Sequence, residues 1–301
     1  MATWKQEDSE GDPRRRAAPL HVEQPSRFPR SCISLIMSPA ADLGRVLCII
    51  TGASRGFGRA VAQDLYRLVQ PGSVLVLAAR SGVDLRTFQA ELTESEAGRA
   101  GLKVEVVVAD IGKVEGLENI MRTSREASCE DMDHIMLINN AASLGDVSKY
   151  VKDFTDMAEV DSYLSLNVSS AMCLTAKVLQ TFPQRPGLRR SIVNVTSLCA
   201  LQPFRSWGLY CSAKAAREMM FKVLAEEEPD LRVLSYSPGP LDTEMQVEAR
   251  TKTADPSIKK TFSNMFAQGQ LLTCEMSSAK LMKLLLDDKF TSGDHIDVFD
   301  V

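Results

Sequence analysis

The sequence predicts one α/β domain built on a doubly wound parallel sheet of about seven strands, with helices on both faces. Continuous apolar runs alternate along the chain with longer segments of helical periodicity, which is the order expected of βαβ units. The first run, Val46-Leu47-Cys48-Ile49-Ile50, is apolar at every position, as a strand covered on both faces requires. It leads directly into a glycine-rich turn at 51–58.

The remaining elements follow from the same alternation. After the glycine-rich turn, an apolar-periodic segment to Val69 predicts the first helix. Further strands are expected at 73–79, 103–109, 134–139, 191–196, 231–236 and 295–299. Further helices are expected near 84–97, 114–126, 155–182, 208–228 and 277–287. Residues 44–301 are therefore expected to form a single folded domain.

Residues 1–43 have a different composition. They hold acidic, basic, proline and serine residues without sustained periodicity, which predicts a disordered extension. Because folded-type sequence begins only near Leu43, Met37 is a candidate alternative start. The acidic residues among the first 23 positions argue against a mitochondrial transit peptide, since such peptides avoid acid.

Composition narrows the functional classes. A formal net charge of −4 gives no broad electrostatic case for binding nucleic acid or an anionic membrane. No apolar run reaches the roughly 18 residues of a membrane span, and none near Met1 resembles a secretory signal. The seven cysteines are odd in number and form no CxxC pair, which fits a reducing cytoplasmic setting better than a disulfide framework. No metal is expected.

The glycine-rich turn is a candidate dinucleotide site. It reads Thr51-Gly52-Ala53-Ser54-Arg55-Gly56-Phe57-Gly58 and stands between a strand and a helix, as in a Rossmann-type fold. Glycines permit a tight turn and close approach of the backbone to a pyrophosphate, which the following helix N-terminus attracts. A glycine cluster alone is often a mere turn, so the prediction depends on the order of strand, turn and helix.

Arginines near this turn favour NADP(H) over NAD(H). The second strand ends at Arg80, where an NAD-selective site would place an acidic residue against the ribose 2′-hydroxyl. An arginine suits a 2′-phosphate instead, and Arg55 could add a second contact. The alternative is that both arginines are solvated surface groups. Asp110, at the end of the third strand, could meet an adenine edge, although a strand-end Asp is often a turn residue.

A candidate proton donor lies farther along the chain. Tyr210 and Lys214 are four residues apart and share one face of the expected helix at 208–228. A nearby ammonium would lower the phenol pKa from about 10, which makes Tyr210 a candidate general acid. Ser197, just past a buried strand, could hold a carbonyl oxygen by hydrogen bond. The alternative is that the pair is an ordinary surface contact on a helix.

Several longer motifs carry a family resemblance that covers nearly all of the folded region. They are TGASRGFGR at 51–59, INNAASLGDVSK at 138–149, SLCALQPF at 197–204, YCSAKAARE at 210–218 and SPGPLDTEMQ at 237–246. With these motifs the chain resembles the short-chain dehydrogenase/reductase family. The resemblance implies that Asn167, Ser197, Tyr210 and Lys214 match the family's catalytic tetrad, with Asn167 helping to position a water beside the lysine. Without it, Asn167 is only a polar residue in a helical pattern.

The resemblance also implies which residues line the NADP(H) site. Lys214 would hold the nicotinamide ribose, and the other positions come from the turns that follow successive strands. These are Gly52, Ala53, Ser54, Arg55, Gly56, Phe57, Gly58, Arg80, Ser81, Ala109, Asp110, Asn140, Leu241, Asp242, Thr243, Glu244, Met245 and Gln246.

A narrower likeness, to the pterin-reducing members of the family, implies a substrate class. Ser292-Gly293-Asp294-His295-Ile296-Asp297 resembles the segment that anchors a pterin, with Asp297 as the carboxylate that would accept two parallel hydrogen bonds. Gly239 would contact the substrate, together with Ser197 and Tyr210. Apolar walls are expected from Leu198, Phe204, Trp207 and Met245, and at least two of these are expected to be core residues instead.

The resemblance therefore implies NADPH-dependent reduction of pterin side-chain carbonyls, as in the synthesis of tetrahydrobiopterin. It also implies a homodimer, in which the helices at 155–182 and 208–228 pack against the second copy. Two alternatives remain open. One is a carbonyl or diketone reductase of broader specificity, because fold and tetrad do not fix the substrate. The other is a catalytically poor NADP(H)-binding regulator.

One departure from the family pattern makes the regulator conceivable. The family's Asn-Asn-Ala-Gly reads Asn139-Asn140-Ala141-Ala142 here, with Ala142 where a glycine normally lies beside the cofactor. If the backbone at this position needs positive φ or a very close approach to the cofactor, the added methyl group strains the site by about 1 kcal/mol or more.

Overall fold

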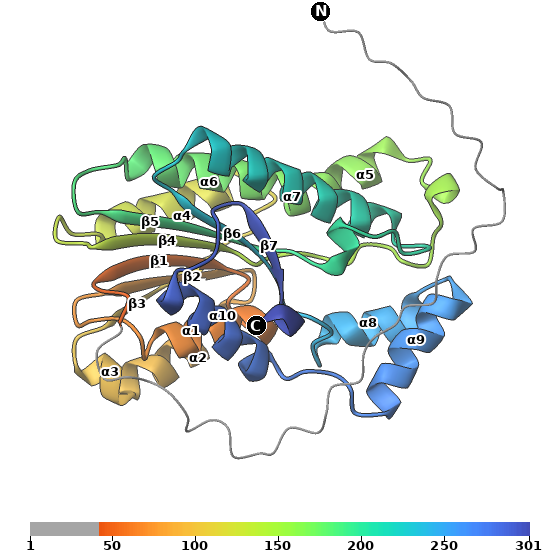
Figure 1. The fold of residues 1–301 in the computed structure, drawn as a ribbon, viewed down its shortest axis with the longest axis horizontal. Coiled ribbons are helices and arrows are strands. Elements are labelled where there is room, and N and C mark those ends of the chain that lie inside the picture. Colours follow the sequence, from red (N-terminus) through yellow and green to blue (C-terminus); the bar gives the residue numbers. More distant parts are fainter. Residues whose placement is uncertain (1–41) are drawn as a thin grey trace, which may run out of the picture. The chain divides into compact units, whose positions relative to one another are not determined.

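The computed structural model describes residues 42–301, which form a seven-stranded sheet (Figure 1). The order of strands is β3-β2-β1-β4-β5-β6-β7, and every neighbouring pair is parallel. The strands are β1 (Val46–Thr51), β2 (Val74–Ala79), β3 (Lys103–Val108), β4 (His134–Asn139), β5 (Arg189–Val195), β6 (Arg232–Ser237) and β7 (Asp294–Asp297). The predicted doubly wound parallel sheet is confirmed.

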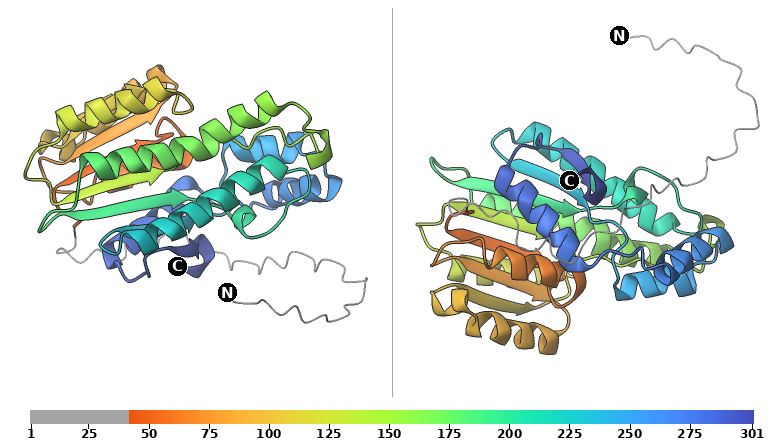
Figure 2. Two further views of the ribbon diagram at one scale, coloured as in Figure 1. Left: turned by 90° about the horizontal axis from the view of Figure 1, so that it is seen from above. Right: turned by 60° about the horizontal axis from the view of Figure 1, so that its bottom comes forward.

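Helices cover both faces of the sheet, as Figures 1 and 2 show. One face carries α1 (Gly56–Leu65), α2 (Gly82–Glu94) and α10 (Cys274–Asp287), and the other carries α4 (Val114–Ala127), α6 (Ser170–Thr181) and α7 (Gly208–Glu227). Both β1 faces are buried, because Val46, Cys48 and Ile50 pack toward the first layer while Leu47 and Ile49 pack toward the second. This is why the β1 sequence is apolar throughout.

The remaining helices are short or lie beyond the sheet. They are α3 (Glu96–Arg99), α5 (Met157–Leu164), α8 (Glu244–Lys252) and α9 (Pro256–Ala267), with single turns η2 (Val151–Asp153), η4 (Leu198–Ala200) and η5 (Val298–Asp300). The expected helix at 155–182 contains a π-helical segment, η3 (Ser165–Ser169), between α5 and α6. Among residues 42–301 no helix is both long enough and apolar enough to cross a membrane.

The pair α8 and α9 was not predicted. The α8 sequence is mostly polar and has no clear apolar stripe, so periodicity does not reveal it. A local signal did exist for α9, because Asp255 caps the helix by accepting from Ser257 and Ile258, and Pro256 occupies its first turn.

Two element boundaries also differ from expectation. The last strand stops at Asp297 rather than at 299, because the Asp297 side chain accepts a hydrogen bond from the Phe299 amide and closes the turn η5. Leu43, assigned to the end of the extension, is buried in the core at 1% exposure and donates from its amide to Leu68. The proposed start at Met37 lies outside the described residues.

The topology fixes where a site can form. The chain order reverses at the sheet centre, where β1 lies between β2 and β4. In open α/β sheets the loops at the carboxyl ends of the strands leave a crevice at such a switch point. Because all seven strands are parallel, the turns after them share one edge of the sheet.

Candidate active site

The glycine turn after β1 has the tight geometry that its sequence predicted. Gly52 has a φ of +70°, and a Cβ there would lie 2.8 Å from the Asn140 side-chain nitrogen. At Gly58 a Cβ would lie 2.4 Å from the Gly52 carbonyl oxygen. The side chain of Asn140 fixes this turn by donating to the carbonyl oxygens of Thr51, at 2.8 Å, and Gly52, at 3.2 Å. The turn therefore has no room for side chains at either glycine.

The α1 N-terminus faces the same edge of the sheet. Its N-cap residue, Arg55, has extended backbone and makes no side-chain capping bond, and α1 has no acidic residue in its first turn. The first N–H groups and the positive end of the helix dipole are thus left for an external anion. This arrangement fits the diphosphate of a dinucleotide.

The residues expected at the adenosine end follow β2 and β3. Arg80 is exposed at the end of β2, and Ser81 accepts from the Asp84 amide to cap α2. The Asp110 carboxylate accepts a hydrogen bond from the Gly112 amide, so Asp110 stabilises the turn after β3. Ala109, at the end of β3, is buried.

Arg55 differs from expectation. Its guanidinium forms an ion pair with Glu244 at the start of α8, so it is not a free second cation. Both side chains are well exposed, at 65% and 71%, and a surface pair of this kind contributes little stability. Through this ion pair the segment 241–246 contacts the glycine turn, as expected if both segments line the same dinucleotide site. Within that segment Gln246 is buried and donates to the Phe262 carbonyl, which ties α8 to α9.

Tyr210 and Lys214 lie in one buried site, and the surface alternative is wrong. Both side chains are buried, at 7% and 4% exposure, and the Lys214 ammonium nitrogen lies 5.5 Å from the centre of the Tyr210 ring. The ammonium donates to the Val195 carbonyl oxygen at 2.7 Å. Ser197 follows two residues later, and its hydroxyl accepts from the Cys199 amide in η4.

The electrostatic relation between tyrosine and lysine is not the expected one. Burial raises the pKa of Tyr210, while a hydrogen bond to Ser197 and the charge of Arg217 oppose this rise. Burial also holds the pKa of Lys214 well below its ordinary value, and Arg217 adds to that lowering. The lowering of the tyrosine pKa expected from Lys214 is therefore absent here, and Arg217 provides the opposing charge.

Asn167 lies in the π-helical segment η3 and is buried at 2% exposure. Its side chain accepts from the Ser143 amide at 2.8 Å and donates to the Tyr163 carbonyl at 2.9 Å. A π-turn places one extra residue in the helix and is frequent at functional sites. It explains why the predicted helix at 155–182 is locally irregular at the residue assigned to the tetrad.

An aromatic cluster forms a wall beside Tyr210. Trp207 meets the Tyr210 ring edge to face at 5.6 Å and stacks on Phe262 of α9 at 5.0 Å. Phe204 and Met245 join this cluster, whereas Leu198 is not among its members. Phe262 was missed because the sequence did not reveal α9. The tryptophan nitrogen donates to Thr253, which anchors the ring.

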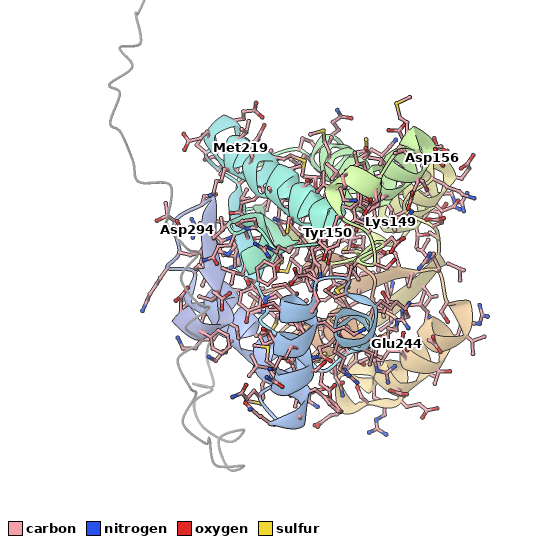
Figure 3. The ribbon with its side chains drawn as sticks, turned by 90° about the vertical axis from the view of Figure 1, so that its right-hand side faces the viewer. Lys149, Tyr150, Asp156, Met219, Glu244 and Asp294 are labelled. Atoms are coloured by element: carbon pink, nitrogen blue, oxygen red, sulfur yellow. The ribbon has the colours of Figure 1, made fainter. Side chains whose placement is uncertain are left out.

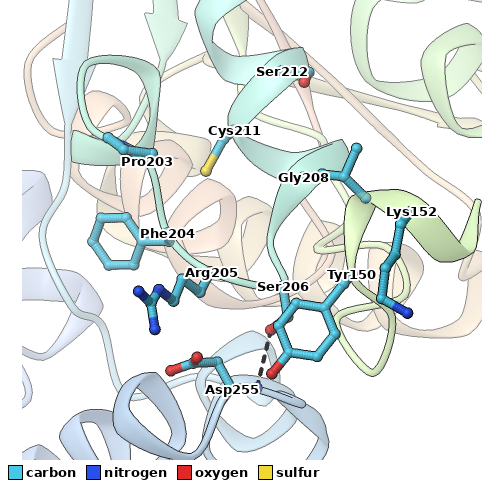
Figure 4. A pocket seen from close by; sticks show the side chains of 11 residues that line it. Tyr150, Lys152, Pro203, Phe204, Arg205, Ser206, Gly208, Cys211, Ser212 and Asp255 are labelled. Carbon is cyan, nitrogen blue, oxygen red and sulfur yellow. Dashed lines mark hydrogen bonds between the residues drawn. The ribbon is translucent and has the colours of Figure 1, made fainter.

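A cleft of about 550 Å³ opens beside this wall (Figure 4). The cleft is lined by Tyr150, Phe204 and Cys211, and also by Asp255 and Ser206. The Asp255 amide donates a hydrogen bond to the Ser206 hydroxyl. A hydrogen bond from Cys199 lowers the pKa of the Cys211 thiol to about 7.

Asp297 and Gly239 lie at the carboxyl ends of β7 and β6, at one side of the sheet. The Asp297 carboxylate accepts from the Ser237 hydroxyl at 2.6 Å, across the β6·β7 pairing. Gly239 has a φ of +76°, and a Cβ there would lie 2.7 Å from Val298. The carboxylate is thus held in a fixed orientation at the carboxyl edge that also carries Ser197.

Ala142 is not strained. Within residues 42–301, only Ser206 and Asp288 combine a side chain with positive φ. The backbone strain expected from a positive φ is therefore absent at Ala142. The expected close approach to the cofactor stays a prediction.

Comparison with known proteins agrees with this geometry. A sepiapterin reductase from Bos taurus is 51% identical over 259 residues, covering 86% of this chain and 96% of the relative. One from Xenopus tropicalis is 49% identical over 264 residues, covering 88% of this chain and all of the relative. A benzil reductase from Bacillus subtilis is 27% identical over 245 residues, covering 79% of this chain and 93% of that protein.

Solved structures share the fold. The KRED1-Pglu enzyme superposes with a TM-score of 0.71 at 26% identity, covering 84% of this chain and all of that one. The family model described as short chain dehydrogenase matches residues 47–254, which include the glycine turn, Ser197, Tyr210 and Lys214. The chain therefore belongs to the short-chain dehydrogenase/reductase family.

Proposed function

We propose that this protein is an NADPH-dependent reductase of pterin side-chain carbonyls. The observation that carries the proposal is the buried pair of Tyr210 and Lys214, with the partly exposed Ser197, beside an aromatic wall, and with the Asp297 carboxylate fixed at the same edge. The sepiapterin reductases, at about half identity over nearly their full lengths, support a pterin as substrate.

The chain's own groups divide the work of such a reduction. NADPH, when bound, supplies the hydride that forms the new C–H bond. The Ser197 hydroxyl orients the carbonyl oxygen, and Tyr210 gives that oxygen its proton, so that the carbonyl becomes an alcohol. Lys214 is rigidly held by Val195 beneath the tyrosine ring. The aromatic wall excludes water from the reacting atoms, and Asp297 holds the polar end of the pterin.

The glycine turn, the α1 N-terminus and Arg80 would hold the dinucleotide. Arg80 stands at the β2 end, where it can pair with a 2′-phosphate, which favours NADP(H). Structures of relatives at low identity, such as the L-sorbose reductase from Gluconobacter frateurii solved with NADPH, share the fold alone, at 23% identity and a TM-score of 0.69.

A diketone reductase is the second candidate. The likeness to the benzil reductase and the aromatic lining of the wall favour it. Asp297 distinguishes the two, because a carboxylate has no partner on an apolar diketone and would lose hydrogen bonds to water there.

The first test is NADPH oxidation with sepiapterin by the parent chain and by Tyr210→Phe. We expect turnover by the parent and a loss of at least about 100-fold in kcat for the variant, because the proton donor is gone. NADPH affinity, measured by fluorescence titration, is expected to be retained. Tyr66→Phe removes a hydroxyl remote from the site as a control. A parent chain that binds NADPH but leaves sepiapterin unreduced would contradict the proposal and favour the diketone reductase or the regulator.

Substitution of the anchor tests the substrate class. Asp297→Asn keeps the shape of the side chain but removes the charge, so KM for sepiapterin is expected to rise by about tenfold or more. KM for NADPH and kcat with benzil are expected to change little. Asp294→Asn, three residues away in the same strand, is the matched control. An equal rise in KM for sepiapterin in both variants would show that Asp297 is not the anchor.

Cofactor preference is tested at the β2 end. Arg80→Glu replaces the cation with the acidic group typical of NAD sites, so KM for NADPH is expected to rise by about tenfold or more while use of NADH improves. Arg99→Glu, with the same charge change in α3, is the control. An unchanged ratio of the two cofactor efficiencies would remove Arg80 from the 2′-phosphate site.

We also propose that the chain pairs with a second copy through α6 and α7. Met172, Met219 and Val223 leave exposed apolar surface on these helices, at 52%, 63% and 45% exposure. Figure 3 shows Met219 on the outer side of α7. Singly exposed apolar residues are ordinary, but three on neighbouring helices are typical of an interface.

Sedimentation velocity tests this pairing. The parent chain is expected to sediment as a dimer, and Met219→Glu is expected to shift it toward the monomer, because a charge would be buried at the interface. Met276→Glu introduces the same charge on α10 as a control. A monomeric parent, or equal behaviour of the two variants, would contradict this interface.

A further inference from the structure

Arg217 is buried at 1% exposure under the candidate active site. Its guanidinium donates to the Asn194 side-chain oxygen and to the Asn139 carbonyl oxygen, at 2.9 and 2.5 Å, and makes a longer contact of 3.5 Å with the Ala141 carbonyl. Arg217 thus joins α7 to the ends of β4 and β5. None of the sequence motifs assigned it a function.

The charge of this arginine has no acidic partner. Its three hydrogen-bond acceptors are neutral, and within residues 42–301 no carboxylate contributes to its pKa. Burial lowers the pKa of Arg217 to about 10, so the side chain remains charged near neutral pH. A buried charge without a counter-ion is costly, and a protein gains nothing in stability from leaving it unpaired.

The position of Arg217 relates it to the proton donor. Tyr210, Lys214 and Arg217 stand at i, i+4 and i+7 of α7, which is one stripe of the helix. The other titratable groups that face Tyr210 are Cys199 of η4 and Tyr163 of α5. Burial raises the pKa of Tyr163, and a hydrogen bond to Cys211 together with burial raises that of Cys199, so both groups are neutral. Arg217 is therefore the cation in this region whose pKa stays well above neutral pH, whereas the pKa of Lys214 lies well below its ordinary value and that of the Cys211 thiol, beside Cys199, is about 7.

We propose that Arg217 is a positioning residue for proton transfer, whose uncompensated guanidinium charge stabilises the negative charge that develops on the Tyr210 oxygen. As the Tyr210 O–H bond breaks and the proton passes to the substrate oxygen, the phenolate forms in a site with low polarity, where a fixed cation has a large effect. The hydrogen bonds to the loop after β4 hold that cation in place. This inference rests on the proposed reductase function.

One substitution would neutralise the positive charge of Arg217 while keeping the arginine side chain in place. Asn194 accepts from the Arg217 Nε atom, and Asp has nearly the same shape as Asn, so Asn194→Asp places a carboxylate against the guanidinium. The pair becomes neutral while the hydrogen bond remains. A Tyr210 that has lost the field of a cation is a weaker acid, so its pKa rises.

The measurement is the pH dependence of carbonyl reduction in single turnovers with bound NADPH, so that product release does not hide the chemical step. Reduction requires protonated Tyr210, and its rate falls on the alkaline side as the tyrosine ionises. In Asn194→Asp we expect this alkaline limb to move upward by about one pH unit, with a few-fold lower rate near neutral pH. Arg217→Lys retains the charge but not the forked hydrogen bonds, and its limb is expected to stay near that of the parent.

Lys222→Met removes a positive charge from the exposed side of the same helix, and its limb is expected to remain unmoved. Thermal unfolding and NADPH affinity are recorded for every variant. A limb that coincides in Asn194→Asp and the parent, with folding and NADPH binding intact, would overturn the proposal and leave Arg217 a structural residue. If Asn194→Asp fails to fold, the Arg217→Lys variant decides instead. An upward shift of the alkaline limb of its pH profile would overturn the proposal equally. A parent chain without turnover at any pH would instead remove the proposed function itself.

Discussion

The structure of the candidate site depends on the hydrogen bonds made by the loop after β4. On one side of this loop, Asn140 holds the carbonyl groups of the glycine turn, and the Thr51 hydroxyl accepts from the Asn140 and Ala141 amides. On the other side, Arg217 holds the loop against α7. Because β1 and β4 are neighbours where the strand order reverses, this loop links the dinucleotide turn to the helix that carries Tyr210 and Lys214.

Burial then determines the electrostatics of that helix. It disfavours the charged form of each group, so it raises the pKa of Tyr210 and lowers that of Lys214. The pKa values of these two neighbouring groups are thus pushed apart, which is the pattern that distinguishes the acid and base roles of groups sharing an active site. Arg80, exposed at the end of β2, differs from these buried groups because water and salt screen its charge.

The apolar side of the site comes from segments that are far apart in sequence. Trp207 precedes α7, Phe262 belongs to α9, and their rings stack at 5.0 Å. The wall they form is apolar, whereas the Asp297 carboxylate, fixed by Ser237, is a charged group at the carboxyl edge of the sheet. A fold shared by reductases of many substrates becomes selective through such additions at the strand ends.

The sequence by itself determined the elements whose signals are local. The apolar β1 run, the spacing of Gly52, Gly56 and Gly58, and the four-residue interval between Tyr210 and Lys214 are set by strand, turn and helix geometry. The tetrad and the cofactor loops were expected from the family resemblance of longer motifs, and the structure gathers them at one edge of the sheet. Ala142 raised a question that only its backbone conformation could answer.

Tertiary structure decided what depends on distant partners. The polar α8 helix has its place because Gln246 and Met245 meet α9 and the aromatic cluster, and no period in its own sequence shows this. The role of Arg217 and the direction of each pKa shift depend on how deeply the groups are buried and on which oxygens surround them. Burial is a property of the packed chain, so these features were decided only when strands and helices far apart in sequence came together.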